Sequence, residues 1–216
     1  MPLYIPFSQQ QLGIWRGGQV SEIFRDPPEA DYPNGDYRLW VGTATIERAA
    51  DYSYFAHAER LHILLEGSGL TLRFREPAET IALATGGWHI FAGDRPLHAT
   101  PVDGPVFAFN LIYRLDRSSG AYSGARSGAR FVAAAEMPVI LPAITANTSL
   151  TRIVYGVAGV ICVESSQGHF LVRAGDTLVY PPAESAGASL RLINFSADAR
   201  LLLTHVLDSG QPTTSA

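Results

Sequence analysis

The sequence predicts an all-β fold built from two barrel-shaped domains, and three observations support this prediction. Short apolar runs recur along the 216 residues, and Gly, Pro, Asp and Asn separate them. Many runs, such as 70–75, alternate apolar and polar residues, which is the pattern of half-buried strands. A stretch rich in Ser, Gly and Arg, residues 116–130, divides the chain into two parts. Many short strands with frequent turns are typical of sandwiches and barrels.

The expected strands follow the apolar runs. In the first part of the chain they are 38–47, 61–66, 69–75, 79–84, 88–92, 96–100 and 106–114. In the second part they are 131–135, 138–142, 151–155, 159–163, 169–173, 177–180, 189–195 and 199–206. No segment keeps a helical period over three turns, so we expect no long helix.

A repeated turn indicates an internal duplication. Each part contains a Gly-Asp turn before a strand, at 93–94 and at 175–176, and a proline follows each turn. Glycine permits a positive φ, and an aspartate side chain can accept hydrogen bonds from turn amides. We therefore expect an N-terminal barrel over 1–115, a flexible loop or linker over 116–130 and a C-terminal barrel over 131–216.

Composition excludes several classes of function. The net charge of −4 and the scattered arginines argue against a nucleic-acid partner. The single cysteine, Cys162, lies in the apolar run 160–163 and is expected to be a small buried hydrophobe, without an intrachain disulfide. No signal-like segment or membrane-length apolar run is found, so we expect a cytoplasmic protein without a membrane partner. A monomer or a homodimer is expected.

Four stretches occur in the order and at the spacing of a known family. They are WRGGQVSEI at 15–23, LWVGTATI at 39–46, FAHAERLHILLEGSG at 55–69, and the segment 91–114. Together they resemble the HutD/Ves family of the RmlC-like cupin superfamily over roughly residues 10–115, whereas the second part is similar only to a generic cupin. The resemblance implies a bicupin, with two double-stranded β-helix barrels in one chain.

Some positions depart from the family pattern. Trp40 stands where the family usually has Arg, and Arg38 lies two residues earlier, on the same face of an extended strand. Residues 56–57, Ala-His, replace Pro-Gly, and Ala108 replaces an Asp. These departures indicate that the ligand of this chain can differ from that of its relatives.

The cupin metal ligands have poor counterparts in the first barrel. Metal cupins use a His-x-His-x(3,4)-Glu cluster and a later His, and imidazole with carboxylate suits iron, manganese and similar ions. With the strand aligned by its turn at 65–67, these positions fall on Tyr54, Ala56 and Arg60, with the later His near Val106. This set does not suit a divalent metal ion.

The histidines also form no expected ligand set. His57 and His62 are five residues apart, so on a strand they face opposite sides. His169 and His205, in the second part, have no partner at ligand spacing. We therefore expect no metal and no other cofactor.

Arg60 is the most informative residue because it stands at the position of a metal-binding Glu. A guanidinium on a barrel wall repels a cation, but it can hold a carboxylate in a bidentate pair. The alternative is an internal ion pair that satisfies the buried charge. The candidate internal partners are Glu22, Glu59 and Asp94.

The remaining candidate residues are polar or aromatic side chains expected near Arg60. They are Trp15, Arg38, Trp40, Tyr54, His62, Trp88 and Asn110. Trp15 is expected near the mouth of the pocket, because the glycines at 17–18 let the backbone approach a ligand. The alternatives are an N-terminal arm packed on the barrel for Trp15, core packing for the other aromatics, and structural hydrogen bonding for Asn110.

The resulting hypothesis is a metal-free bicupin that binds a small organic acid in its N-terminal barrel. The family resemblance implies a regulator or metabolite sensor connected to histidine utilisation. The rival hypothesis is a cupin enzyme, an acid–base isomerase or lyase in which His62 is the base and Glu22 orients it, or a metal-dependent oxygenase. A third possibility is an interaction protein with both barrels filled by side chains. No catalytic residue is assigned.

Overall fold

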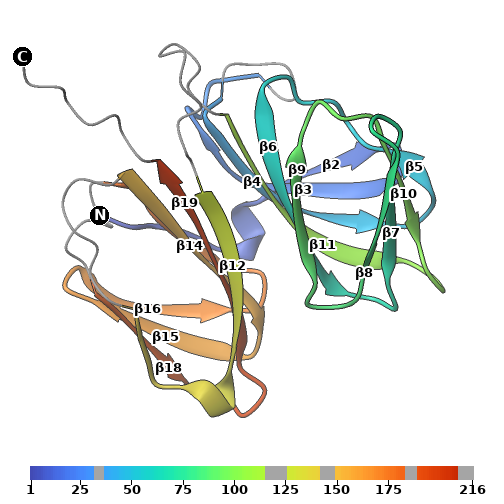
Figure 1. Cartoon of the computed structure of the whole chain (residues 1–216). Helices are drawn as coiled ribbons and strands as arrows, with labels where there is room; N and C mark the ends of the chain where they lie inside the picture. The colour runs from blue at the N-terminus through green and yellow to red at the C-terminus, as the bar shows by residue number, and fades with distance from the viewer. Residues whose placement is uncertain (32–36, 115–125, 142–148, 183–188, 209–216) are drawn as a thin grey trace, which may run out of the picture. The chain divides into compact units, whose positions relative to one another are not determined.

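The computed structural model describes residues 1–31, 37–114, 126–141, 149–182 and 189–208. Within these ranges most regular structure is strand, with the short 3-10 helices η1 (Phe7–Gln9) and η2 (Ala134–Glu136) between strands. The expected all-β class is therefore confirmed. The chain folds as two compact units, which are described separately (Figure 1).

One unit comprises residues 10–115 and consists of two antiparallel sheets. The six-stranded sheet contains, in spatial order, β2 (Gln11–Trp15), β3 (Gly18–Asp26), β4 (Leu39–Ile46), β11 (Val106–Arg114), β6 (Ala58–Glu66) and β9 (Trp88–Ala92). The four-stranded sheet contains β5 (Ala50–Asp51), β10 (Leu97–Pro101), β7 (Leu70–Phe74) and β8 (Glu79–Leu83).

The core of this unit joins its two sheets. On β7, Leu70, Leu72 and Phe74 are buried, whereas Arg73 between them is exposed, as the period-two pattern predicts. These side chains cluster with Ile46 of β4 and with residues of β6, β9 and β11. Full burial of each large apolar side chain stabilises the fold by ~1.5–3 kcal/mol.

The second unit comprises residues 1–9 and 116–216 and repeats the two-sheet plan. Its five-stranded sheet contains, in spatial order, β1 (Leu3–Ile5), β17 (Thr177–Tyr180), β14 (Ser149–Ala158), β19 (Arg200–Asp208) and β12 (Arg126–Ala133). Its four-stranded sheet contains β13 (Val139–Leu141), β18 (Leu190–Asn194), β15 (Val160–Ser165) and β16 (Gly168–Arg173). Each unit is a cupin-type barrel, so the chain is a bicupin.

The boundaries of the two units differ from the predicted ones at the N-terminus. Residues 1–9 were expected in the first barrel, but β1 pairs antiparallel with β17 of the second. The Tyr4 hydroxyl donates a hydrogen bond to Asp176 Oδ2 at 2.6 Å, and the Phe7 amide donates to its Oδ1 at 2.9 Å. Asp176 belongs to the predicted Gly-Asp turn, which thus anchors the N-terminal arm.

The last five residues of the predicted linker lie in a strand. Residues 126–130 belong to β12, which pairs with β19, and 115–125 lie outside the described residues. The strands β1, β2 and β3, all before residue 27, were also absent from the predicted set.

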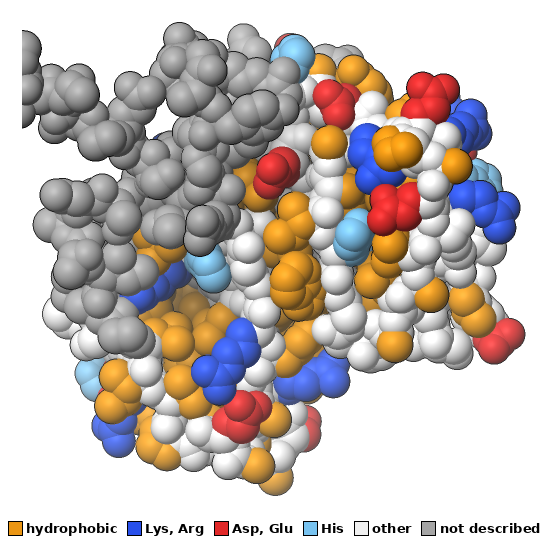
Figure 2. Space-filling model, viewed as in Figure 1, with side chains coloured by type: hydrophobic (Ala, Val, Ile, Leu, Met, Phe, Trp, Pro, Cys, Tyr) orange, Lys and Arg blue, Asp and Glu red, His pale blue; other side chains and the backbone are white. Residues whose placement is uncertain are grey.

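The surface is mixed in charge. Figure 2 shows acidic and basic side chains interspersed on the visible face of the described residues. In the described part of the chain, no helix has the length and apolar character needed to cross a membrane.

Candidate functional site

A small cavity lies in the unit formed by residues 10–115. Ten residues line it: Trp15, Val20, Trp40, Ala44, Tyr52, Ser53, Phe55, Arg60, Asn110 and Ile112. Its volume is about 30 Å³, which is room for on the order of two water molecules. Aromatic and aliphatic side chains form most of the wall, and Arg60 supplies a positive charge.

Strand pairing brings the polar side chains of the site together. Arg60 and His62 are two residues apart on β6, so their side chains share one face of the sheet. Asn110 lies directly opposite His62 on the neighbouring strand β11. The site is therefore fixed by the antiparallel register of two central strands.

Arg60 is buried and held in place from two sides. Its Nε and Nη2 atoms donate hydrogen bonds to Asn110 Oδ1 at 2.9 and 2.7 Å. The guanidinium also lies over the Tyr52 ring, 4.3 Å from its centroid, with the Phe55 and Phe91 rings at 5.8 and 5.9 Å. A cation over an aromatic face is stabilised by the ring quadrupole. The charge is thus positioned before any ligand arrives.

His62 is not among the lining residues but contacts two of them, Asn110 and Tyr52. Its Nδ1 lies 2.6 Å from Asn110 Oδ1, and its Nε2 lies 3.3 Å from the Tyr52 hydroxyl. Because the amide oxygen can only accept, Nδ1 must carry the proton and Nε2 accepts from Tyr52. Burial, and then the Arg60 charge, lower the pKa of His62 to about 3. Burial raises the pKa of Tyr52, so the phenol keeps its proton.

Two tryptophans complete the wall of the cavity. Trp40 donates from Nε1 to Glu22 Oε2 at 2.7 Å, and Trp15 donates to the carbonyl oxygens of Gln19 and Thr45. Trp15 also meets the Tyr52 ring edge to face at 5.4 Å.

Glycines make room for both indole rings. A Cβ at Gly17 would lie 2.2 Å from the Trp15 ring, and one at Gly42 would lie 2.3 Å from the Trp40 ring. Each glycine is thus required by the close approach of a ring, and not only by its turn or strand.

The structure does not bring every predicted residue to the cavity. Arg60, Trp15, Trp40 and Asn110 line it, and His62 bonds to the lining. Three other predicted residues lie elsewhere: Arg38, Tyr54 and Trp88.

Each of these three corrections has a local reason. Arg38 precedes the start of β4, is exposed, and pairs with Asp26. Tyr54 is 61% exposed because it lies between β5 and β6, outside any strand, where strand alternation does not apply. Trp88, the first residue of β9, is 45% exposed.

Tyr52 is a polar residue of the candidate site that the sequence did not predict. It contacts both Arg60 and His62, whereas the prediction favoured its neighbour Tyr54. A tyrosine in the loop before β6 was the available signal, but the loop conformation decides which of the two points inward. The apolar lining residues Val20, Ala44 and Ile112 carry no chemical signal in the sequence.

Two of the carboxylates considered as internal partners of Arg60, Glu22 and Glu59, contact other side chains. Glu22 accepts from Trp40 and lies 3.2 Å from Arg25 Nη2. Glu59 accepts a hydrogen bond from the Tyr113 hydroxyl at 2.5 Å. His62 contacts Asn110 and Tyr52, so the His62–Glu22 pair of the enzyme hypothesis is not assembled.

The cavity does not fit a cupin metal ion. Its polar side chains include the cationic Arg60 and the neutral Asn110, whose oxygen already accepts three contacts. Both ring nitrogens of His62 are engaged, and the Arg60 charge would repel a cation. The arrangement favours an anion instead.

Comparison with known proteins shows which solved structures the chain is similar to. No curated protein sequence matches it. Among solved structures, it is similar to a conserved protein of unknown function, PA5104, from Pseudomonas aeruginosa PAO1, at 20% identity and a TM-score of 0.78, covering 97% of this chain and 100% of the other. HutD from Pseudomonas fluorescens SBW25 is 19% identical with a TM-score of 0.67 and the same coverage.

An oxalate decarboxylase shares the fold at lower identity. Lactobacillus farciminis oxalate decarboxylase, solved as a formate complex, is 12% identical with a TM-score of 0.61, covering 96% of this chain and 86% of the other. The HutD family model matches residues 8–191. The chain therefore belongs to the HutD family.

Proposed function

We propose that the protein binds a small carboxylate in the cavity beside Arg60. The observation that carries this proposal is a buried guanidinium that lines the cavity and is oriented by Asn110 and Tyr52. Hydrogen bonds from a guanidinium to a carboxylate are charge-assisted, and they strengthen where water is excluded.

The size and lining of the cavity narrow the ligand class. A volume of about 30 Å³ suits the head of a compact carboxylate more than a bulky acid. The rings of Trp15, Trp40 and Phe55 offer apolar contact to the rest of the ligand.

We propose that ligand binding serves regulation or metabolite sensing in histidine utilisation. Membership of the HutD family supports this role. A neutral His62 without an orienting carboxylate gives no comparable support to acid–base catalysis. A cytoplasmic location and a monomeric or homodimeric state stay predictions of the sequence.

A thermal-shift experiment tests the binding proposal. Formate, acetate and larger organic acids are added to the purified chain, and the melting temperature is recorded. A ligand at 100 times its Kd stabilises the folded state by roughly 2.7 kcal/mol, which is a shift of several degrees. If no acid in the panel shifts the melting temperature, the proposal fails.

Matched variants assign the shift to the cavity. Arg60→Ala should abolish it, and Ala44→Val should abolish it by filling the cavity without removing charge. Arg38→Ala removes an exposed arginine outside the cavity and should keep the full shift. Circular dichroism checks that each variant is folded.

A further inference from the structure

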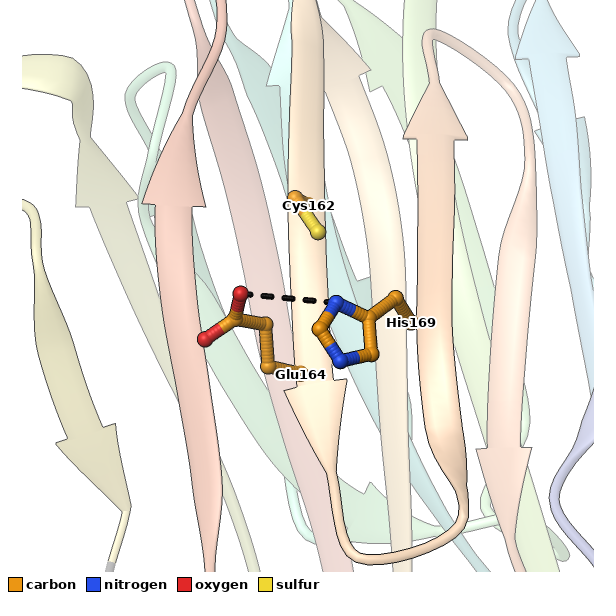
Figure 3. A group of neighbouring side chains, drawn as sticks. All are labelled: Cys162, Glu164 and His169. Carbon is orange, nitrogen blue, oxygen red and sulfur yellow. Dashed lines mark ion pairs between the residues drawn. The ribbon is translucent and has the colours of Figure 1, made fainter.

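The outer face of the β13-β18-β15-β16 sheet carries three chemically versatile side chains, drawn in Figure 3. Cys162 and Glu164 are two residues apart on β15 and so share one face, and His169 lies opposite Glu164 on β16. The adjacent residues Ile161 and Val163 belong to the core, so the three side chains lie on the face away from it. The β15–β16 hairpin thus gives His169 the partners that sequence spacing did not reveal.

The ligand atoms of these three side chains converge. One atom from each, the Cys162 thiol sulfur, a Glu164 oxygen and a His169 ring nitrogen, lies within 4.8 Å of the other two. His169 Nδ1 lies 3.5 Å from Glu164 Oε1, the dashed contact in Figure 3. Cys162 is buried and the His169 side chain is 71% exposed, so the group has a closed inner side and an open outer side.

Arg191, on the neighbouring strand β18, orients the Glu164 carboxylate. Its Nη1 lies 3.2 Å from Glu164 Oε2, and β18, which carries it, pairs with β15. Each carboxylate oxygen therefore has its own neighbour: Oε1 lies beside the His169 imidazole and Oε2 beside Arg191. An outer partner of this kind fixes the direction of a ligating carboxylate.

We propose that Cys162, Glu164 and His169 bind one divalent transition-metal ion, with Zn²⁺ as the preferred ion. Thiolate, carboxylate and imidazole are the three side-chain ligand types of zinc sites, and three protein ligands leave a fourth position open to solvent. On binding, the thiol proton is released to water and the sulfur forms the metal bond. This site is independent of the carboxylate cavity.

The three ligand atoms must move only slightly closer together to hold a metal ion. Metal–ligand bonds of ~2.0–2.3 Å put neighbouring ligand atoms about 3.5 Å apart. The present group must therefore contract by about 1 Å. Rotation of the exposed His169 side chain can supply this movement without disturbing the sheet.

Cobalt titration tests the proposal with a spectroscopic signal. The full-length, tag-free and metal-free chain is titrated with Co²⁺, and ultraviolet absorption is recorded. We expect a thiolate-to-cobalt charge-transfer band that saturates at one equivalent and disappears when Zn²⁺ is added. The chain has a single cysteine, so the band reports Cys162 alone.

Variants distinguish a site from chance coordination. Cys162→Ser should remove the band, and His169→Ala should weaken Co²⁺ binding at least tenfold. His98→Ala is the matched control, because His98 is also exposed and paired with a carboxylate, Asp51, and it should change nothing. Since His169 is exposed, its variant should fold normally by circular dichroism. Absence of the band in the wild type, or an undiminished affinity in His169→Ala, would overturn the proposal.

Discussion

The two barrels share a two-sheet plan, but the two groups of polar side chains proposed to bind ligands lie in different places. In the unit of residues 10–115, Arg60, His62 and Asn110 point inward and surround a cavity. The second unit also buries an arginine, Arg152, but Cys162, Glu164 and His169 form a separate polar group on the outside of a sheet. The comparison teaches that one barrel plan can place polar groups in its interior, on an outer sheet face, or on both, depending on which strand positions carry polar residues.

The largest expected effect comes from breaking the internal polar network of the first barrel. Asn110→Ala removes the oxygen that accepts from Arg60 and contacts His62. Leaving these buried donors without that oxygen should destabilise the protein by about 3 kcal/mol. Urea unfolding measures this loss. On the external face, Glu164→Ala removes only partly solvated contacts and should cost under ~1 kcal/mol; an equal cost for both variants would break the comparison.

The next effect concerns the repeated Gly-Asp turn. Asp176→Ala removes the acceptor for Tyr4, Phe7 and the Arg173 amide. We expect a loss of roughly 2 kcal/mol and faster amide exchange in β1, because the arm loses its anchor. Hydrogen exchange read by mass spectrometry measures the arm directly. Asp94, the matching residue of the first barrel, should leave exchange in β1 unchanged when mutated to Ala.

A third effect, of similar size, is a pH dependence that arises inside the first barrel. Because the folded-state pKa of His62 is about 3, below its ordinary value, the unfolded chain binds more protons at mildly acidic pH. The stability is fully present above the ordinary histidine pKa and falls as pH decreases from there toward 3. From pH 7 to pH 5 this contributes a loss of about 2 kcal/mol. His62→Gln should flatten the profile in that range, and an unchanged slope would contradict the assignment.

Periodicity predicted the fold, but it did not predict the first three strands. On β2, Leu12 and Ile14 are 76% and 89% exposed, so this edge strand lacks a buried face to reveal it. The pairing of β1 with β17 joins residues more than 170 positions apart. Such pairings depend on tertiary packing and not on local pattern.

The sequence predicted the part of the site that lies on the two paired central strands, β6 and β11. Arg60, His62 and Asn110 lie on paired strands, and their convergence follows from register. Tyr52 and Tyr54 lie in a loop, where no periodicity assigns a direction. Cys162 is buried, as its apolar run predicted, but only the β15–β16 register shows that it lies beside Glu164 and His169.

The central claim is that the cavity beside Arg60 binds a small carboxylate, and calorimetric titration of the wild-type chain with formate and acetate tests it most directly. The account predicts binding of one carboxylate per chain, with Kd at least tenfold weaker in both Arg60→Ala and Ala44→Val and unchanged in Arg38→Ala. No binding to the wild type, or wild-type affinity in folded Arg60→Ala, would contradict it.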